Sequence, residues 1–143
     1  MSNNSQSRKW HMVINNPLEH GMSHESIIRL LMLFSPEYFC LSDEISSTET
    51  FHTHGFIYSP APIRFNTLKT RFPVAHIEKA YGSVLDNKNY ILKTGKWADA
   101  HFPLFIAQAV YKVRRLAPGR MALRWCRASR QVGIKAPKVR ERR

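Results

Sequence analysis

The chain has 143 residues, of which 43% are apolar, and its 22 Lys and Arg against 10 Asp and Glu give a formal net charge of +12. This length suits one domain with a buried core and leaves no room for a second large domain such as an ATPase motor. So basic a chain favours a polyanionic partner, with nucleic acid the first expectation and an anionic membrane surface the second.

The excess charge lies mainly in the last third of the chain. Residues 1–98 carry a net charge of +2, whereas residues 99–143 carry +10. The two cysteines, Cys40 and Cys126, are too few for a disulfide framework and form no zinc-binding CxxC pair, which favours a reducing intracellular setting. No apolar run approaches the roughly 18 residues of a membrane span, so no membrane partner is expected.

Capping residues, prolines and glycines divide residues 10–97 into short elements, after a polar arm over residues 1–9 that is expected to be disordered. In chain order, these elements are a strand over residues 10–15, a helix over 24–34, strands over 38–45 and 53–59, a helix capped by Asn66 over 66–72, a strand over 74–78 and a helix over 84–94. This order predicts an α+β fold, with a mainly antiparallel sheet of about five strands flanked by helices. Beyond Trp97, residues 102–113 have a helical pattern, and the Arg-rich remainder predicts no element.

Two histidines lie at the start of the strand that closes the expected hairpin. Residues i and i+2 of a strand point to the same face, so His52 and His54 can reach one metal ion. The hairpin brings Glu44 opposite these imidazoles, whereas Asp43 should point to the other face. One carboxylate and two imidazoles leave coordination positions open, as in a catalytic metal site. The alternative is a pair of strand histidines with no ligand role beside a solvated turn carboxylate.

Tyr90 and Lys93 lie three residues apart and share one face of the expected helix over residues 84–94. A tyrosine can act as an oxygen nucleophile once its proton is removed, and a lysine one turn away supplies positive charge to the phenolate or to a phosphate. The alternative is a half-buried tyrosine beside a solvated lysine. A YxxK pair alone occurs often by chance, so it supports a catalytic function only in combination with the metal-ligand pattern.

Three motifs in order resemble the endonuclease domain of the HUH rolling-circle replication initiators. These are the Rep proteins of circular single-stranded-DNA viruses, such as circoviruses and geminiviruses, and of related bacterial plasmids. The motifs are Asn15-Asn16-Pro17 after an apolar strand, Glu44 with His52-Thr53-His54, and Tyr90-Ile91-Leu92-Lys93. The resemblance implies a ferredoxin-like HUH endonuclease domain over residues 10–97.

The resemblance implies metal-dependent, site-specific nicking and joining of single-stranded DNA, which initiates rolling-circle replication. Tyr90 would attack the scissile phosphate and form a covalent 5′-phosphotyrosine, while Lys93 would stabilise the charge on the phenolate or phosphate. Glu44, His52 and His54 would hold a divalent metal, Mg²⁺ or Mn²⁺, as a Lewis acid. The implied partner is single-stranded DNA at an origin hairpin, in the cytoplasm of a bacterial host or the nucleus of a eukaryotic one. An oligomer or a separate helicase partner is left open.

Several polar and basic side chains are candidate DNA contacts. Asn15 and Asn16 could bind base or backbone edges, although an Asn-Asn-Pro sequence also simply stops a strand. The basic candidates for phosphate contacts are Lys9, Arg64 and Lys69. For each of these the alternative is a solvated basic surface. Tyr81 is not expected to be a second nucleophile, because no lysine follows it at the same spacing.

Residues 98–143 depart from the family pattern and contain no helicase domain. Their Arg- and Ala-rich composition fits either a basic DNA-binding extension or, as the preferred interpretation, the product of a truncated or frame-shifted gene. The competing interpretation of the whole chain is a non-catalytic module that binds single-stranded nucleic acid. Such a module gives no reason for the metal-ligand and YxxK residues to occur together. The enzyme hypothesis requires Glu44, His52 and His54 to converge in the fold and Tyr90 to face them.

Overall fold

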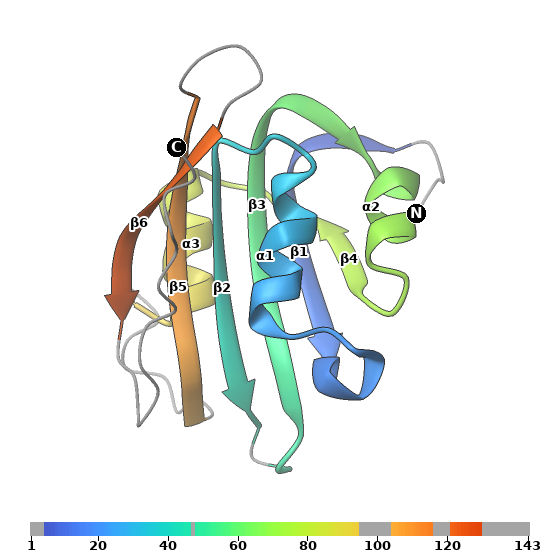
Figure 1. Cartoon of the computed structure of the whole chain (residues 1–143), viewed down its shortest axis with the longest axis vertical. Coiled ribbons are helices and arrows are strands. Elements are labelled where there is room, and N and C mark those ends of the chain that lie inside the picture. Colours follow the sequence, from blue (N-terminus) through green and yellow to red (C-terminus); the bar gives the residue numbers. More distant parts are fainter. Residues whose placement is uncertain (1–4, 47, 95–103, 116–120, 130–143) are drawn as a thin grey trace.

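The computed structural model describes residues 5–46, 48–94, 104–115 and 121–129. The elements are β1 (Gln6–Asn15), a 3-10 helix η1 (Pro17–His20), α1 (His24–Met32), β2 (Tyr38–Ile45), β3 (Phe51–Arg64), α2 (Phe65–Arg71), β4 (His76–Lys79), α3 (Val84–Leu92), β5 (Leu104–Arg115) and β6 (Met121–Ser129). The strands form one sheet in the order β4-β1-β3-β2-β5-β6, in which every neighbouring pair is antiparallel (Figure 1). The predicted α+β class is therefore confirmed, with six strands rather than about five.

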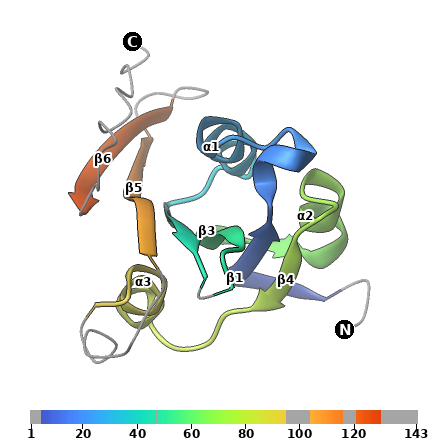
Figure 2. The ribbon, with the colours of Figure 1, turned by 90° about the horizontal axis from the view of Figure 1, so that it is seen from below.

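Helices cover both faces of the sheet. Figure 2 shows α1 and α2 on one face and α3 on the other. The larger core lies under α1 and α2, where Trp10, Phe39 and Leu68 are fully buried. A smaller core under α3 includes Phe56 and Ile91. No helix in the described part of the chain is long and apolar enough to cross a bilayer.

Serines cap α1 and α3, whereas α2 begins without a side-chain cap. Ser23 caps α1 as its sequence predicts, because its hydroxyl oxygen accepts a hydrogen bond from the Ser26 N–H at 3.2 Å. Ser83 caps α3 and exchanges reciprocal hydrogen bonds with Asp86, which fixes the start of that helix. The predicted cap of α2 at Asn66 is wrong, since α2 begins at Phe65 without a side-chain cap.

The first strand is longer than its sequence predicts. Residues 6–9 belong to the expected disordered arm, but Gln6 and Ser7 pair with Arg64 and Ile63 of β3. The ladder is irregular between Ser7 and Lys9, opposite the Pro-Ala-Pro segment at residues 60–62. Prolines are tolerated at such a bulge, so β3 continues through a segment that its sequence suggests would end it.

The last third of the chain contributes two strands rather than the predicted helix over residues 102–113. Strand β5 pairs with β2 along its length, and β6 pairs with β5. Val110 is buried in the core under α3, and Tyr111 is fully buried on the opposite face, where its ring stacks on Phe39 with centroids 4.9 Å apart. At least part of the segment interpreted as a gene-truncation product is therefore packed into the sheet.

Truncation of Tyr111 tests the contribution of β5 to stability. We expect Tyr111→Ala to lower the free energy of unfolding by about 3–5 kcal/mol, because it removes a fully buried aromatic ring from the larger core. The control is Lys112→Ala, whose side chain is exposed on the same strand, with an expected change within about 0.5 kcal/mol. Urea denaturation followed by circular dichroism gives both values. Equal values for the two variants would mean that β5 is not packed on β2.

Candidate active site

A carboxylate and two imidazoles converge on the sheet face that α3 covers. Glu44 of β2 lies directly opposite His52 of β3, and His54 lies two residues farther along β3 on the same face. One carboxylate oxygen, Glu44 Oε2, is 3.1 Å from His52 Nε2 and 3.5 Å from His54 Nε2. The three ligand atoms lie within 4.8 Å of one another. The convergence that the enzyme hypothesis requires is present.

The chemistry of this donor set fits a divalent cation. The Glu44 carboxylate is only 1% exposed and lies close to no Lys or Arg ion-pair partner among the described residues, so a bound cation would compensate its buried charge. Burial lowers the pKa of His54 to about 4, and the positive charges of Lys93 and His52 act in the same direction. His54 is therefore neutral near pH 7 and has a nitrogen lone pair available as a metal ligand.

Helix α3 brings the YxxK motif over the same face, since it packs on β2 and β3. Tyr90 is 37% exposed. Lys93 lies just beyond the last helical residue in a left-handed conformation, with φ of 54°, rather than on a regular helical turn as the spacing predicts. This turn places Lys93 Nζ 4.3 Å from the centre of the Tyr90 ring. Burial lowers the pKa of Lys93, and the charge of Glu44 opposes that shift, so the lysine lies within electrostatic range of the metal-ligand cluster.

His11 of β1 is a neighbour of the site that its spacing in the sequence does not reveal. Its ring centre is 5.4 Å from that of Tyr90, and its Nε2 is hydrogen-bonded to Asn87 Oδ1 in α3. The Asn87 amide nitrogen donates to the carbonyls of Tyr81 and Ser83 at 2.9 and 2.8 Å, so its oxygen must be the acceptor. His11 therefore carries its proton on Nε2 and holds α3 against the sheet. The period-two pattern of β1 is the only sequence signal for it, since it puts His11 on the face of Asn15.

A second polar cluster lies directly behind Glu44, His52 and His54, on the other face of the same two strands. Asp43 points away from the triad as its sequence predicts, and Thr53 Oγ1 donates to Asp43 Oδ1 at 2.7 Å. His24 of α1 lies 2.8 Å from the other carboxylate oxygen. The buried Asp43 is therefore satisfied by two partners, and α1 is tied to the hairpin that carries the triad.

Asn15 and Lys9 of β1 lie on the site face, and Asn16 follows β1 directly. Asn15 is exposed and pairs with His52 in the β1–β3 ladder, so it adjoins the triad. Asn16 turns the chain at the end of β1 with φ of 48°, and its N–H donates to the Phe51 carbonyl. Lys9 lies farther back on β1, and its ammonium donates to the Gly82 carbonyl just before α3.

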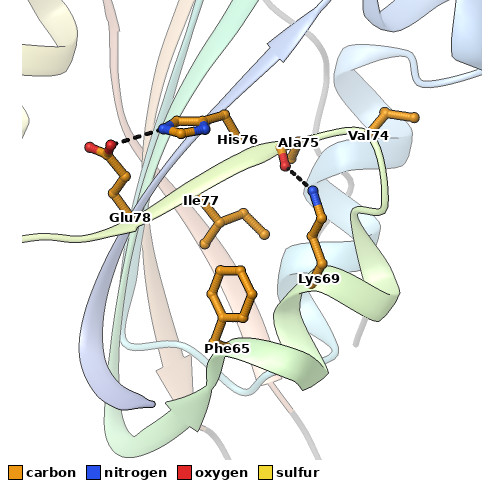
Figure 3. Close-up of a pocket in the computed structure, with 7 residues that line it drawn as sticks. All are labelled: Phe65, Lys69, Val74, Ala75, His76, Ile77 and Glu78. Atoms are coloured by element: carbon orange, nitrogen blue, oxygen red, sulfur yellow. Dashed lines mark hydrogen bonds and ion pairs between the residues drawn. The ribbon is translucent and has the colours of Figure 1, made fainter. Parts of the chain in front are cut away.

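The other two candidates lie away from the triad. Arg64 is exposed at the far end of β3. Lys69 belongs to α2, on the face opposite α3, and its ammonium donates to the Ala75 carbonyl at 2.6 Å. Figure 3 shows Lys69 in a pocket at the β4 edge. The residues that line this pocket are Phe65, Lys69, Val74, Ala75, His76, Ile77 and Glu78. None of them is a predicted metal ligand or nucleophile.

Comparison with known proteins covers the segment that builds this site. Residues 7–94 match the family described as "Putative viral replication protein". The chain is 30% identical over 89 residues to the replication-associated protein of pigeon circovirus, which covers 62% of this chain and 27% of that protein. It is 31% identical over 88 residues to that of beak and feather disease virus, covering 62% and 29%, and 40% identical over 58 residues to that of human associated cyclovirus 1, covering 40% and 21%.

All three of these matches are to proteins of one class, the replication-associated proteins of viruses. The chain belongs to the viral replication protein family, and the resemblance to Rep proteins is confirmed. It spans less than a third of the length of the curated relatives it matches.

Proposed function

We propose that this chain nicks and joins single-stranded DNA at a replication origin, with Tyr90 as the nucleophile and a divalent cation held by Glu44, His52 and His54. The observation that carries this proposal is the position of the tyrosine helix. α3 packs on the two strands that bring the three ligand atoms within 4.8 Å of one another. A module that only binds nucleic acid has no use for a buried carboxylate grouped with two imidazoles under the helix that carries a tyrosine and a lysine.

The reaction is a transesterification that needs no external energy source. The phenol oxygen of Tyr90 attacks the scissile phosphorus, a new P–O bond to tyrosine forms, and the bond from phosphorus to the 3′ oxygen breaks. The phenol proton leaves, and the departing 3′ oxygen takes up a proton. One phosphodiester replaces another, so a 3′-hydroxyl can later attack the phosphotyrosine and restore the DNA strand.

Different side chains have different roles in the transesterification. Lys93 lies beside the Tyr90 ring and supplies positive charge where the phenolate and the transferred phosphate accumulate negative charge. Glu44, His52 and His54 would hold the cation, which would supply Lewis-acid charge to the phosphate oxygens. His11 and Asn87 fix the helix that carries the nucleophile. Exposed Asn15 beside His52 is suited to contact the strand near the scissile phosphate.

A pool of single-stranded DNA hairpins with randomised loops tests this proposal without knowledge of the origin sequence. With Mn²⁺, label at the DNA 3′ end should become attached to the protein, and label at the 5′ end should be released on a shorter strand. This opposite fate of the two labels is expected because the 5′ phosphate of the downstream fragment joins the tyrosine. Mass spectrometry of the digested adduct should find the modification on Tyr90.

Chelation of the metal with EDTA is the control for the adduct assay and should abolish label transfer. Retention of both labels on intact DNA, together with measurable DNA binding in a gel-shift assay, would contradict the proposal and favour the non-catalytic binding module. Shorter strands without a labelled protein would indicate hydrolysis by water rather than attack by tyrosine.

A further inference from the structure

Behind the triad, a buried glutamine from β5 contacts both parts of the site. Gln108 is 3% exposed and lies opposite Ser42 in the β2–β5 ladder. Its amide nitrogen Nε2 is 3.1 Å from Ser42 Oγ and 3.1 Å from the carbonyl oxygen of Leu92. Ser42 Oγ is in turn 3.1 Å from Glu44 Oε1. We call this chain of hydrogen bonds from Leu92 through Gln108 and Ser42 to Glu44 the Gln108 network.

The Leu92 carbonyl fixes the donor and the acceptor of every hydrogen bond in the network. The Leu92 carbonyl can only accept, so the Gln108 amide must turn its NH₂ toward it. The same NH₂ donates to Ser42 Oγ, and the single hydroxyl proton of Ser42 is then left for Glu44 Oε1. Oε1 is therefore occupied by a hydrogen bond, and Oε2 is the carboxylate oxygen that faces both histidines.

The other end of the network holds the helix that carries the tyrosine. Leu92 is the last residue of α3, two residues after Tyr90 and directly before Lys93. The carbonyls at the end of a helix lack intrahelical partners, so a side-chain donor there fixes the last turn. Ser42, Glu44, Leu92 and Gln108 are all at most 3% exposed, which makes each of these hydrogen bonds costly to lose.

We propose that Gln108 is a positioning residue of the active site. Through Ser42 it selects the Glu44 oxygen that is presented to the cation, and through Leu92 it sets the position of the Tyr90–Lys93 turn relative to that oxygen. This inference rests on the proposed function for the role of the turn, but its effect on the Glu44 carboxylate is independent of any nicking activity. It also assigns a role to β5, which lies outside the segment that matches the family.

The test uses the full chain and two variants, Gln108→Met and Ser42→Ala, with Mn²⁺ alone as the probe. Outer hydrogen-bond partners of metal ligands typically change affinity 10- to 100-fold, so we expect each variant to weaken Mn²⁺ binding about 10-fold in a calorimetric titration. In the double variant the losses should not add, because both changes break the same network. Lys112→Met, an exposed change on the same strand, is the matched control and should bind Mn²⁺ like the wild type.

The adduct assay at saturating Mn²⁺ separates the two ends of the network. Even at saturating Mn²⁺, Gln108→Met should form the adduct about 10-fold more slowly than the wild type in a single turnover. Ser42→Ala keeps the contact between Gln108 and Leu92, so excess Mn²⁺ should restore its rate close to that of the wild type. The dissociation constant for the DNA should be unchanged in both variants. If Gln108→Met loses its circular dichroism spectrum, Ser42→Ala alone decides the effect on Glu44, because it removes only one hydroxyl group.

Wild-type Mn²⁺ affinity in both Gln108→Met and Ser42→Ala would overturn the inference. So would an equal loss in Lys112→Met, which would indicate a general effect of β5. Failure of the proposed function gives a different pattern. In that case the wild type forms no adduct with any hairpin, yet the Mn²⁺ titrations still show whether the Gln108 network acts on Glu44.

Discussion

The Tyr90→Phe variant is expected to form no covalent adduct and to cleave the hairpin pool at least about 10⁴-fold more slowly than the wild type. The change removes the attacking oxygen and keeps the ring. The contacts of that ring with His11 and Lys93, at 5.4 and 4.3 Å, are retained, so the melting temperature should change little. Denaturing gel electrophoresis of end-labelled DNA measures both adduct and cleavage, and circular dichroism measures the melting temperature.

Tyr81→Phe is the matched control, because it removes a second phenol oxygen nine residues away. Tyr81 is 81% exposed in the loop that precedes α3. The residue three positions after it is Val84 rather than a lysine, so it has no YxxK motif. The Tyr81 variant should form the adduct at the wild-type rate. The assignment is wrong if Tyr90→Phe keeps its adduct while Tyr81→Phe loses it, since the nucleophile would then be Tyr81.

Neutralising Glu44 is expected to weaken Mn²⁺ binding and adduct formation without destabilising the metal-free protein. A Glu44→Gln variant should lose at least about 100-fold in Mn²⁺ affinity, because direct ligands contribute more than the outer partners that already account for 10- to 100-fold. Adduct formation should fall in parallel. Gln can still accept the Ser42 hydrogen bond through Oε1, and it removes a carboxylate that is only 1% exposed. Without metal, the variant should therefore be at least as stable as the wild type.

Calorimetric Mn²⁺ titration and urea denaturation without metal measure these two effects. Glu37→Gln makes the same chemical change at an exposed position just before β2 and should alter neither quantity. Unchanged Mn²⁺ affinity in Glu44→Gln would remove Glu44 from the metal site. A fall in stability without metal would mean that the buried carboxylate is compensated by its surroundings rather than by a cation.

The hairpin and the triad could be predicted from sequence because they depend on local rules. A strand has a period of two, so His52 and His54 had to share a face, and a short polar turn brought Glu44 opposite them. The serine cap of α1 follows equally local chemistry. Short stretches of sequence are thus enough to predict that these elements exist and which residues form the triad.

The remaining parts of the site depend on contacts between distant residues. Gln108 reaches Ser42 across 66 positions of sequence, and His11 reaches Asn87 across 76. Periodicity can place His11 on a face of its strand, but it does not identify a partner so far away in the sequence. The pattern over residues 102–113 predicted a helix where the structure has the strand that carries Gln108. The left-handed turn at Lys93 was also not predictable, since a non-glycine residue with positive φ is uncommon.

The Thr53–Asp43 pair behind the triad makes assembly of the candidate metal ligands inseparable from correct strand pairing. Residues that pair directly share a face of the sheet, so a slip of one residue between β2 and β3 would place Glu44 on the opposite face from His52 and His54. The same slip would separate Thr53 from Asp43 and break the hydrogen bond between these two buried side chains. The pairing error is thus penalised on both faces at once, and a molecule that completes its core also brings Glu44, His52 and His54 together.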